Sequence, residues 1–293
     1  MALPSPFKGY HHATYPAIDP SRPELSLKGK NVIVTGGGGT IGSAMVGAFA
    51  QAGVNLIGIV GRNQKTLDST KAKHATQYPG VNLVTATADI TDPTSLEAAF
   101  TQIRDTAKGP IDILISNAGY LARPATIMES EPREWWTAFE INAKGSFNTL
   151  RAFHAVAVTP QAVIVNLTSG AAQVANPAWS AYSASKLAGI RVFQTFQVEN
   201  PDFHVVSIQP GIIQSDMSDK AGPGITPQDS ADLPASFAVW LCSPEARFLK
   251  NKFVWANWDV DEMKARANQI QNSPLFTMGL AGWPVLPDEP ASG

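Results

Sequence analysis

The chain has 293 residues, of which 44% are hydrophobic and 16% charged, a composition that excludes an intrinsically disordered protein. Lys and Arg number 22 against 24 Asp and Glu without long runs of either sign, so no nucleic-acid or membrane-surface partner is indicated. The sequence lacks a signal peptide pattern and any apolar run of about 18 residues, and Cys242 is its single cysteine. We therefore expect a cytoplasmic protein without disulfides that acts on small molecules.

The first 29 residues are rich in proline and poor in aliphatic side chains. Proline interrupts both helices and central strands, so neither is expected there. We interpret residues 1–29 as an extended N-terminal arm that lies on the body of the protein through Phe7, Tyr10 and Tyr15.

From Asn31 onward, short β-branched runs alternate with stretches of helical length and spacing. The expected strands are residues 32–34, 56–60, 83–85, 111–115, 163–165, 205–208 and 253–255. The expected helices are residues 43–52, 95–106, 135–156 and 182–199. This alternation predicts an α/β fold, with a doubly wound parallel sheet of about seven strands in a single domain over residues 30–260. Residues 261–293 form a C-terminal extension with one short helix pattern.

A glycine cluster, Thr35 to Gly42, lies between the first expected strand and its helix. At this position of an open α/β sheet, glycines let the backbone approach a pyrophosphate, whose charge faces the positive end of the helix. A flexible linker is the alternative for a lone glycine cluster. The flanking strand and helix favour a dinucleotide site.

The end of the second strand decides which nicotinamide cofactor binds. Between Gly53 and Asp68 there is no carboxylate to accept hydrogen bonds from a free ribose 2′-hydroxyl, and Arg62 lies there instead. A guanidinium can hold a 2′-phosphate with two parallel charge-assisted bonds. Arg62 therefore favours NADP(H), with a solvated loop arginine as the alternative.

Tyr182 and Lys186 are four residues apart, on the same face of an expected helix. A nearby ammonium can lower a phenol pKa of about 10 by the roughly 3 units that acid or base catalysis near neutrality requires. Taken alone, such a pair also occurs on many solvated helices. Ser169 follows an expected strand thirteen residues before Tyr182, and Asn142 lies inside an expected helix, where asparagine is a poor helix former.

Together these motifs resemble the short-chain dehydrogenase/reductase family, whose fold is of the Rossmann type, over roughly residues 29–260. The resemblance implies a catalytic tetrad of Asn142, Ser169, Tyr182 and Lys186. The cofactor-binding residues that it implies are Gly36, Gly39, Ile41, Gly42, Arg62, Asp89, Asn117, Ala118, Gly119, Tyr182, Lys186, Pro210, Gly211, Ile213 and Ser215. The arm and the C-terminal end are similar to fungal members near secondary-metabolite pathways.

The function that follows is NADP(H)-dependent hydride transfer between nicotinamide and a carbonyl or secondary alcohol, with ketone reduction as the favoured direction. The resemblance implies that Tyr182 transfers the proton and that Lys186 lowers the pKa of Tyr182 and binds the nicotinamide ribose. It also implies that Ser169 holds the substrate oxygen and that Asn142 anchors a relay water. One alternative is a non-redox enzyme of the same fold that uses Tyr182 as acid or base for cyclisation, dehydration or isomerisation. A second is a cofactor-sensing protein, which has no need for the tetrad. The five histidines have no metal-binding spacing.

Three further features concern the surroundings of the site. Thr40 replaces a small residue of the family motif, and Ala256 to Asp259 replaces its glycine pair after the last strand. Residues 215–234, rich in Gly and Pro, are expected to form a mobile lid over an open pocket. Side chains that are candidates for an apolar or aromatic substrate pocket are Tyr120, Leu121, Trp179 and Met217.

The resemblance also implies a homodimer or homotetramer. In the family, the helices that hold Asn142 and Tyr182 pair across a twofold axis. Apolar residues expected either in this shared core or against the chain's own sheet are Trp135, Trp136, Phe139, Phe193 and Phe196.

Overall fold

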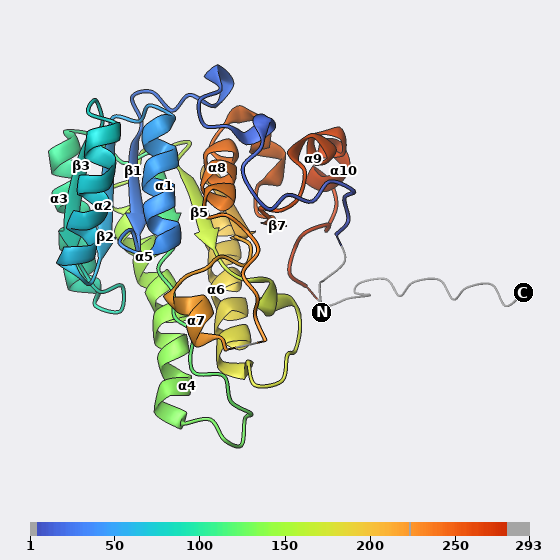
Figure 1. Ribbon diagram of the computed structural model, residues 1–293. Helices are drawn as coiled ribbons and strands as arrows, with labels where there is room; N and C mark the ends of the chain where they lie inside the picture. Colours follow the sequence, from blue (N-terminus) through green and yellow to red (C-terminus); the bar gives the residue numbers. More distant parts are fainter. Residues whose placement is uncertain (1–4, 223, 280–293) are drawn as a thin grey trace, which may run out of the picture.

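Seven parallel strands form one sheet at the centre of the molecule (Figure 1). The structure is a computed structural model, which describes residues 5–222 and 224–279. The strands are β1 (Asn31–Thr35), β2 (Leu56–Gly61), β3 (Asn82–Thr87), β4 (Ile113–Ser116), β5 (Val163–Leu167), β6 (His204–Gln209) and β7 (Phe253–Trp255). Their order in space is β3-β2-β1-β4-β5-β6-β7, and every neighbouring pair is parallel. The predicted doubly wound α/β fold is confirmed.

Helices cover both faces of the sheet, which explains why its strands are continuous apolar runs. Val32 and Val34 of β1 point to one face and Ile33 to the other, because successive side chains of a strand alternate. The first face packs against α1 (Thr40–Gln51), α2 (Gln64–Gln77) and α8 (Asp232–Leu241). The second packs against α3 (Pro93–Ala107), α5 (Gly145–His154) and α6 (Ser180–Glu199).

The chain reverses its direction of winding between β1 and β4. It runs outward from β1 through β2 to β3, and then returns to β4 on the other side of β1. At such a switch point the connections after the two central strands diverge and leave a crevice at the carboxyl edge of the sheet. Thr35 and Ser116, which are paired in register, mark this edge on β1 and β4.

The helix expected over residues 135–156 is present over 132–154, but one turn in its middle is not α-helical. α4 (Pro132–Phe139) extends past the sheet (Figure 1) and continues into a π-helical turn, η3 (Glu140–Lys144), before α5 begins. The Ser146 hydroxyl donates to the Asn142 carbonyl at 2.7 Å, and a Cβ at Gly189 of α6 would lie only 2.8 Å from the same oxygen. The turn is therefore packed closely against α6, a contact that periodicity does not reveal.

Two helices that flank the site were not predicted. α2 buries only Leu67, Thr70 and His74, so it lacks a clear apolar stripe. In α8, every residue from Leu233 to Leu241 is buried, so it has no polar face. The expected lid segment, residues 215–234, accordingly contains the start of α8 and a short helix, α7 (Asp216–Lys220).

The N-terminal arm packs on the C-terminal part of the chain. Figure 1 shows it in dark blue beside α9 (Val260–Ala265) and α10 (Ala267–Gln271), where the sequence predicted one helix. The buried Phe7 ring lies 5.5 Å from the Trp258 ring, and the Tyr15 hydroxyl accepts a hydrogen bond from the Val260 amide at 3.0 Å. The arm also contains two 3₁₀ turns that were not expected, η1 (Pro16–Ile18) and η2 (Pro23–Leu25). Each begins at a proline, which suits the first position of a helical turn.

Two further 3₁₀ helices complete the fold, η4 (Gly170–Gln173) after β5 and η5 (Pro244–Leu249) after α8. The aromatic residues expected at a shared surface separate into two groups. Phe193 is fully buried in the chain's own core, whereas Trp136 on α4 is 57% exposed. Phe147 on α5, which was not among the expected residues, is 50% exposed. Within the described part of the chain, no helix has both the length and the apolar character needed to span a membrane.

Candidate active site

The glycine-rich turn after β1 forms one end of the site. Gly36 has φ +65°, a left-handed conformation that favours glycine, and a Cβ there would lie 2.8 Å from Nδ2 of Asn117. Asn117 holds this turn, because its Nδ2 donates to the carbonyls of Thr35 at 2.9 Å and Gly36 at 3.1 Å. The Thr35 hydroxyl in turn accepts from the backbone amides of Asn117 and Ala118. The Asn117 side chain therefore fixes the shape of the turn.

Arg62 and Asp89 lie on the rim of the cavity beyond this turn. Their nearest charged atoms, Nη1 and Oδ2, are 3.9 Å apart, and the two side chains are 69% and 39% exposed. An ion pair with this separation and this exposure to solvent holds the guanidinium only weakly. Arg62 is therefore able to turn toward an anion in the cavity.

Tyr182 and Lys186 lie at the other end of the site, in the buried first half of α6. The Lys186 ammonium donates to the Leu167 carbonyl at 3.2 Å and lies 5.8 Å from the centroid of the Tyr182 ring. Burial lowers the pKa of Lys186 to about 8. Burial raises the pKa of the Tyr182 phenol, and its interaction with Ser169 acts in the opposite direction.

This result differs from the expectation that Lys186 lowers the phenol pKa. The ammonium is directed to the end of β5, and loss of hydration at Tyr182 dominates. Ser169 caps η4 by accepting a hydrogen bond from the Ala171 amide at 3.2 Å. Its position after β5 places its side chain beside the Tyr182 phenol.

Asn142 lies in the π-helical turn, and its side chain is occupied by protein partners. Oδ1 accepts from the Tyr120 amide at 2.9 Å, while Nδ2 donates to the Tyr120 carbonyl at 2.8 Å and to the Ser185 hydroxyl at 2.9 Å. Asn142 therefore joins the segment after β4 to α6. A relay water would have to use its backbone carbonyl, which accepts from Ser146 and retains a second lone pair.

A single cavity of about 800 Å³ connects the glycine turn to Tyr182 and Lys186. It is lined by all the expected cofactor residues except Gly211 and Ile213, and Asn142 and Ser169 do not line it either. The sequence missed Thr168, a residue that lines the cavity and whose buried hydroxyl has no hydrogen-bond partner among the described residues. The sequence could have indicated Thr168, because it directly precedes Ser169 at the end of an expected strand.

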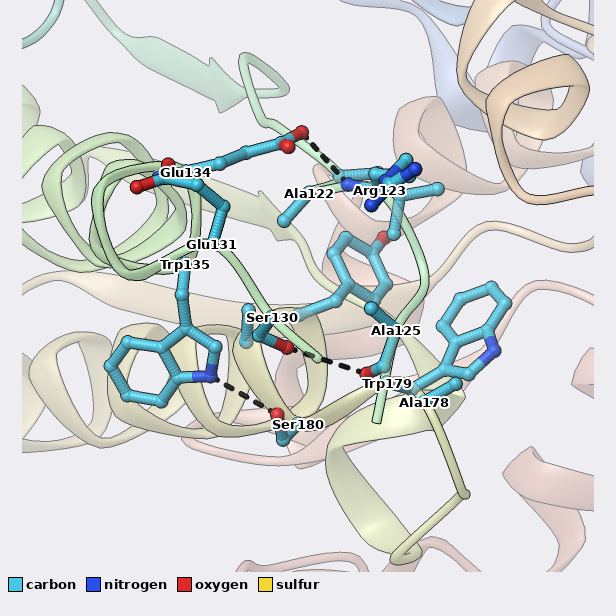
Figure 2. A pocket seen from close by; sticks show the side chains of 13 residues that line it. Ala122, Arg123, Ala125, Ser130, Glu131, Glu134, Trp135, Ala178, Trp179 and Ser180 are labelled. Atoms are coloured by element: carbon cyan, nitrogen blue, oxygen red, sulfur yellow. Dashed lines mark hydrogen bonds between the residues drawn. The ribbon is translucent and has the colours of Figure 1, made fainter. Parts of the chain in front are cut away.

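Two segments build the wall beside Tyr182 (Figure 2), residues 121–135 and the beginning of α6. The Trp135 indole donates to the Ser180 hydroxyl at 3.0 Å and thereby joins these segments. The Trp179 ring meets the Tyr182 ring edge to face at 5.8 Å. Tyr182 is thus flanked by aromatic surface on the side away from the glycine turn.

Residues of α7 also line the cavity. The Lys220 ammonium of this helix donates to the Tyr120 hydroxyl at 3.0 Å and to Oε1 of Glu134 at 3.2 Å, and lies 4.3 Å from the centroid of the Tyr120 ring. Glu134 also accepts from the Arg123 amide at 2.9 Å. These contacts tie the expected lid segment to the wall shown in Figure 2.

Comparison with known proteins agrees with this architecture. A family model described as short chain dehydrogenase matches residues 30–225. The chain belongs to the short-chain dehydrogenase family. This oxidoreductase family acts on small molecules with nicotinamide cofactors.

Two curated relatives of this short-chain dehydrogenase come from fungi. The chain is 32% identical to "Short chain dehydrogenase/reductase AacuD" from Aspergillus aculeatus, over 94% of this chain and 96% of that protein. It is 31% identical to "Short chain dehydrogenase pigC" from Monascus ruber, over 89% and 88% of the two chains.

Solved structures share the fold of this short-chain dehydrogenase. A short chain dehydrogenase from Burkholderia cenocepacia, solved in complex with NADP, has a TM-score of 0.71 at 22% identity, covering 80% of this chain and 99% of its own. Levodione reductase has a TM-score of 0.73 at 20% identity, covering 84% and 99%.

Proposed function

We propose that this oxidoreductase uses NADP(H) to reduce the ketone of a small apolar or aromatic substrate to a secondary alcohol. The observation that carries the proposal is the single cavity that joins the glycine turn and Arg62 to Tyr182 and Lys186. The NADP complex of the Burkholderia cenocepacia neighbour supports the choice of cofactor. The fungal origin of the relatives supports a role in fungal secondary metabolism.

The residues around the cavity fit an NADP molecule. The backbone of the glycine turn and the N-terminus of α1, including Thr40, would hold the pyrophosphate. Arg62 would bind the 2′-phosphate in two parallel bonds. At the other end, Lys186 supplies a donor beside the nicotinamide half.

Side chains of the protein transfer the proton that the reaction requires. When bound, the cofactor supplies hydride to the carbonyl carbon. Tyr182 donates its phenolic proton to the carbonyl oxygen, so the C=O becomes an H–C–O–H group and a phenolate remains. Ser169 does not line the cavity, but it interacts with the Tyr182 phenol and would hold the substrate oxygen beside that phenol. The Lys186 ammonium stabilises the phenolate, which regains a proton from solvent by way of a water bound at the backbone carbonyl of Asn142.

The substrate side of the cavity is apolar and aromatic. Trp179 lies against Tyr182, and Tyr120, Leu121 and Met217 also line the walls. An apolar substrate buried here excludes water from the Tyr182 phenol. The loss of water strengthens the interaction of the phenol with the negative charge that develops on the substrate oxygen.

Loss of the absorbance of NADPH in the presence of a panel of aryl and alkyl ketones tests the function. We expect turnover with at least one ketone and equal amounts of NADP formed and ketone consumed. Binding of NADPH with conversion of a test compound but without NADPH oxidation would instead support the non-redox alternative. Binding without any conversion would support a cofactor sensor.

A further inference from the structure

A buried carboxylate lies behind the cavity wall, at the start of the segment that leads into α8. The Asp229 side chain is only 1% exposed. Its Oδ2 accepts from the Ile212 amide at 2.6 Å, and its Oδ1 accepts from Nδ2 of Asn257 at 3.0 Å. Nδ1 of His12, from the N-terminal arm, lies 2.6 Å from Oδ1. Three segments that are distant in the sequence therefore meet at one carboxylate.

The segment held by Asp229 forms part of the cavity. Ile212 lies between Pro210 and Ser215, both of which line the cavity, and Met217 follows directly at the Tyr182 hydroxyl. The Ile212 carbonyl also accepts from the Asp229 amide at 3.1 Å. The position of this wall relative to Tyr182 thus depends on the carboxylate.

Gly211 brings the segment into direct contact with Asp229. Its φ of +103° suits glycine, and a Cβ there would lie 2.8 Å from Oδ2 of Asp229. Because the backbone packs this closely against the carboxylate, a displacement of Asp229 moves the segment as well.

The arm completes the shell of polar groups around Asp229. Besides its ring contact, His12 accepts a hydrogen bond at its carbonyl from the Ser230 amide at 2.7 Å. Asn257 donates to the His11 carbonyl at 2.8 Å, so the arm and the end of β7 are fixed together. A buried carboxylate that loses one donor is destabilised in its position, because the remaining groups must compensate for its charge.

We propose that His12 is a positioning residue for the nicotinamide nucleotide. Through Asp229, it fixes residues 210–215 in the conformation that receives the nicotinamide half of the cofactor. The N-terminal arm is thereby a working part of the cofactor site, although it does not line the cavity. This inference rests on the proposed NADP(H)-dependent function.

The neighbouring arm histidine provides a matched control. Nε2 of His11 lies 2.9 Å from Oδ2 of Asp259, in the same kind of pair. Asp259, however, caps the N-terminus of α9 and does not line the cavity. His11→Ala therefore weakens the docking of the arm without removing a donor from Asp229.

The test is to measure the Kd of NADPH for the full chain by titration, comparing wild type with His12→Ala, His12→Asn and His11→Ala. We expect His12→Ala to raise Kd about tenfold, or about 1.4 kcal/mol, and His11→Ala to raise it less than about twofold. In His12→Asn the amide nitrogen takes the place of Nδ1, so Kd should return to within about threefold of wild type. The thermal midpoints of the two alanine variants should be similar.

Equal weakening by the two alanine variants would overturn the proposal, because docking of the arm alone would then explain the effect. An unchanged Kd in His12→Ala would overturn it as well. If His12→Ala does not fold, His12→Phe, which keeps a ring but has no donor, replaces it in the comparison with His12→Asn. If wild type does not bind NADPH, the proposed function itself fails and this inference with it.

Discussion

The sulfur of Met217 lies 3.8 Å from the hydroxyl of Tyr182, so a residue of α7 covers the group that the proposed reaction uses. Tyr182 is only 8% exposed. Methionine is flexible and polarizable, so it can yield its place to a substrate carbonyl at little cost. The contact therefore keeps the phenol dry without blocking it permanently.

Replacement of Tyr182 by phenylalanine removes the proton donor and leaves the ring. We expect kcat for ketone reduction to fall at least about a hundredfold, the usual lower size of general acid catalysis, while the Kd of NADPH changes little. Steady-state kinetics and cofactor titration measure the two effects. Retention of more than about a tenth of kcat would remove Tyr182 from this role.

Lys186→Met should stabilise the protein near neutral pH while lowering its activity. Burial depresses the pKa of Lys186 to about 8, so below that pH folding buries a charge. Between pH 8 and about 10.5, Lys186 is protonated in the unfolded chain but largely neutral in the folded one, so the free energy of unfolding of the wild type rises with pH. The variant should exceed wild type in free energy of unfolding by up to about 3 kcal/mol below pH 8, the size that corresponds to this pKa shift. This difference should decrease between pH 8 and 10, which urea unfolding at both pH values would measure. A variant less stable than wild type at pH 7 would contradict the argument.

Arg62→Ala should reduce the preference for NADPH over NADH. A bidentate guanidinium contact with phosphate contributes about 1.5 to 3 kcal/mol, which corresponds to roughly tenfold to a few hundredfold in Kd. We expect weaker binding of NADPH with NADH nearly unchanged, measured by parallel titrations. Arg104→Ala, which changes an exposed arginine paired with Asp105, is the control. Equal loss for both cofactors would mean that Arg62 supports the loop or the adenine instead.

Lys220→Met should loosen the contact between α7 and the opposite wall. Partly exposed ion pairs contribute about 0 to 1 kcal/mol, so the KM of the ketone should rise by no more than about fivefold. The Kd of NADPH should stay the same, because Tyr120 and Glu134 lie on the substrate side. Lys264→Met breaks a comparable pair with Glu245 away from the cavity and should leave KM unchanged.

The exposed aromatic residues of α4 and α5 support the expected homo-oligomer. Trp136 and Phe147 are both at least half exposed, so they are available for contact with a second copy of the chain. Light scattering at micromolar concentration should give at least a dimer for wild type, and a monomer for a variant with Trp136→Glu and Phe147→Glu. A monomeric wild type would contradict the expectation.

The sheet was predictable because each buried strand is a short apolar run and the intervening helices show their period. Where that signal is missing, the prediction failed. α8 is buried all round, and α2 buries few apolar residues, so neither has an apolar stripe. The turn at Asn142 depends on packing against Gly189, 47 residues later, which local patterns do not contain.

Much of the site followed from motifs, because its residues lie directly after strands whose carboxyl ends share one edge. The contacts that these side chains make with one another could not be predicted from the motifs. The side-chain amide groups of Asn117 and Asn142 are engaged with protein, and the Lys186 ammonium contacts Leu167. The pair of His12 and Asp229 joins residues 217 positions apart and has no local signature.

The docking of the arm on Trp258 and Phe276 also constrains the order in which the chain can fold during synthesis. Phe7 leaves the ribosome long before Trp258 and Phe276, which form its binding surface. The glycine turn and strands β1 to β6 can assemble earlier, whereas the arm must wait in solvent until β7 and the residues after it are available. The cofactor site would then reach its final form only after Phe276 has been synthesised, so a chain that terminates before this residue would not hold its nucleotide firmly.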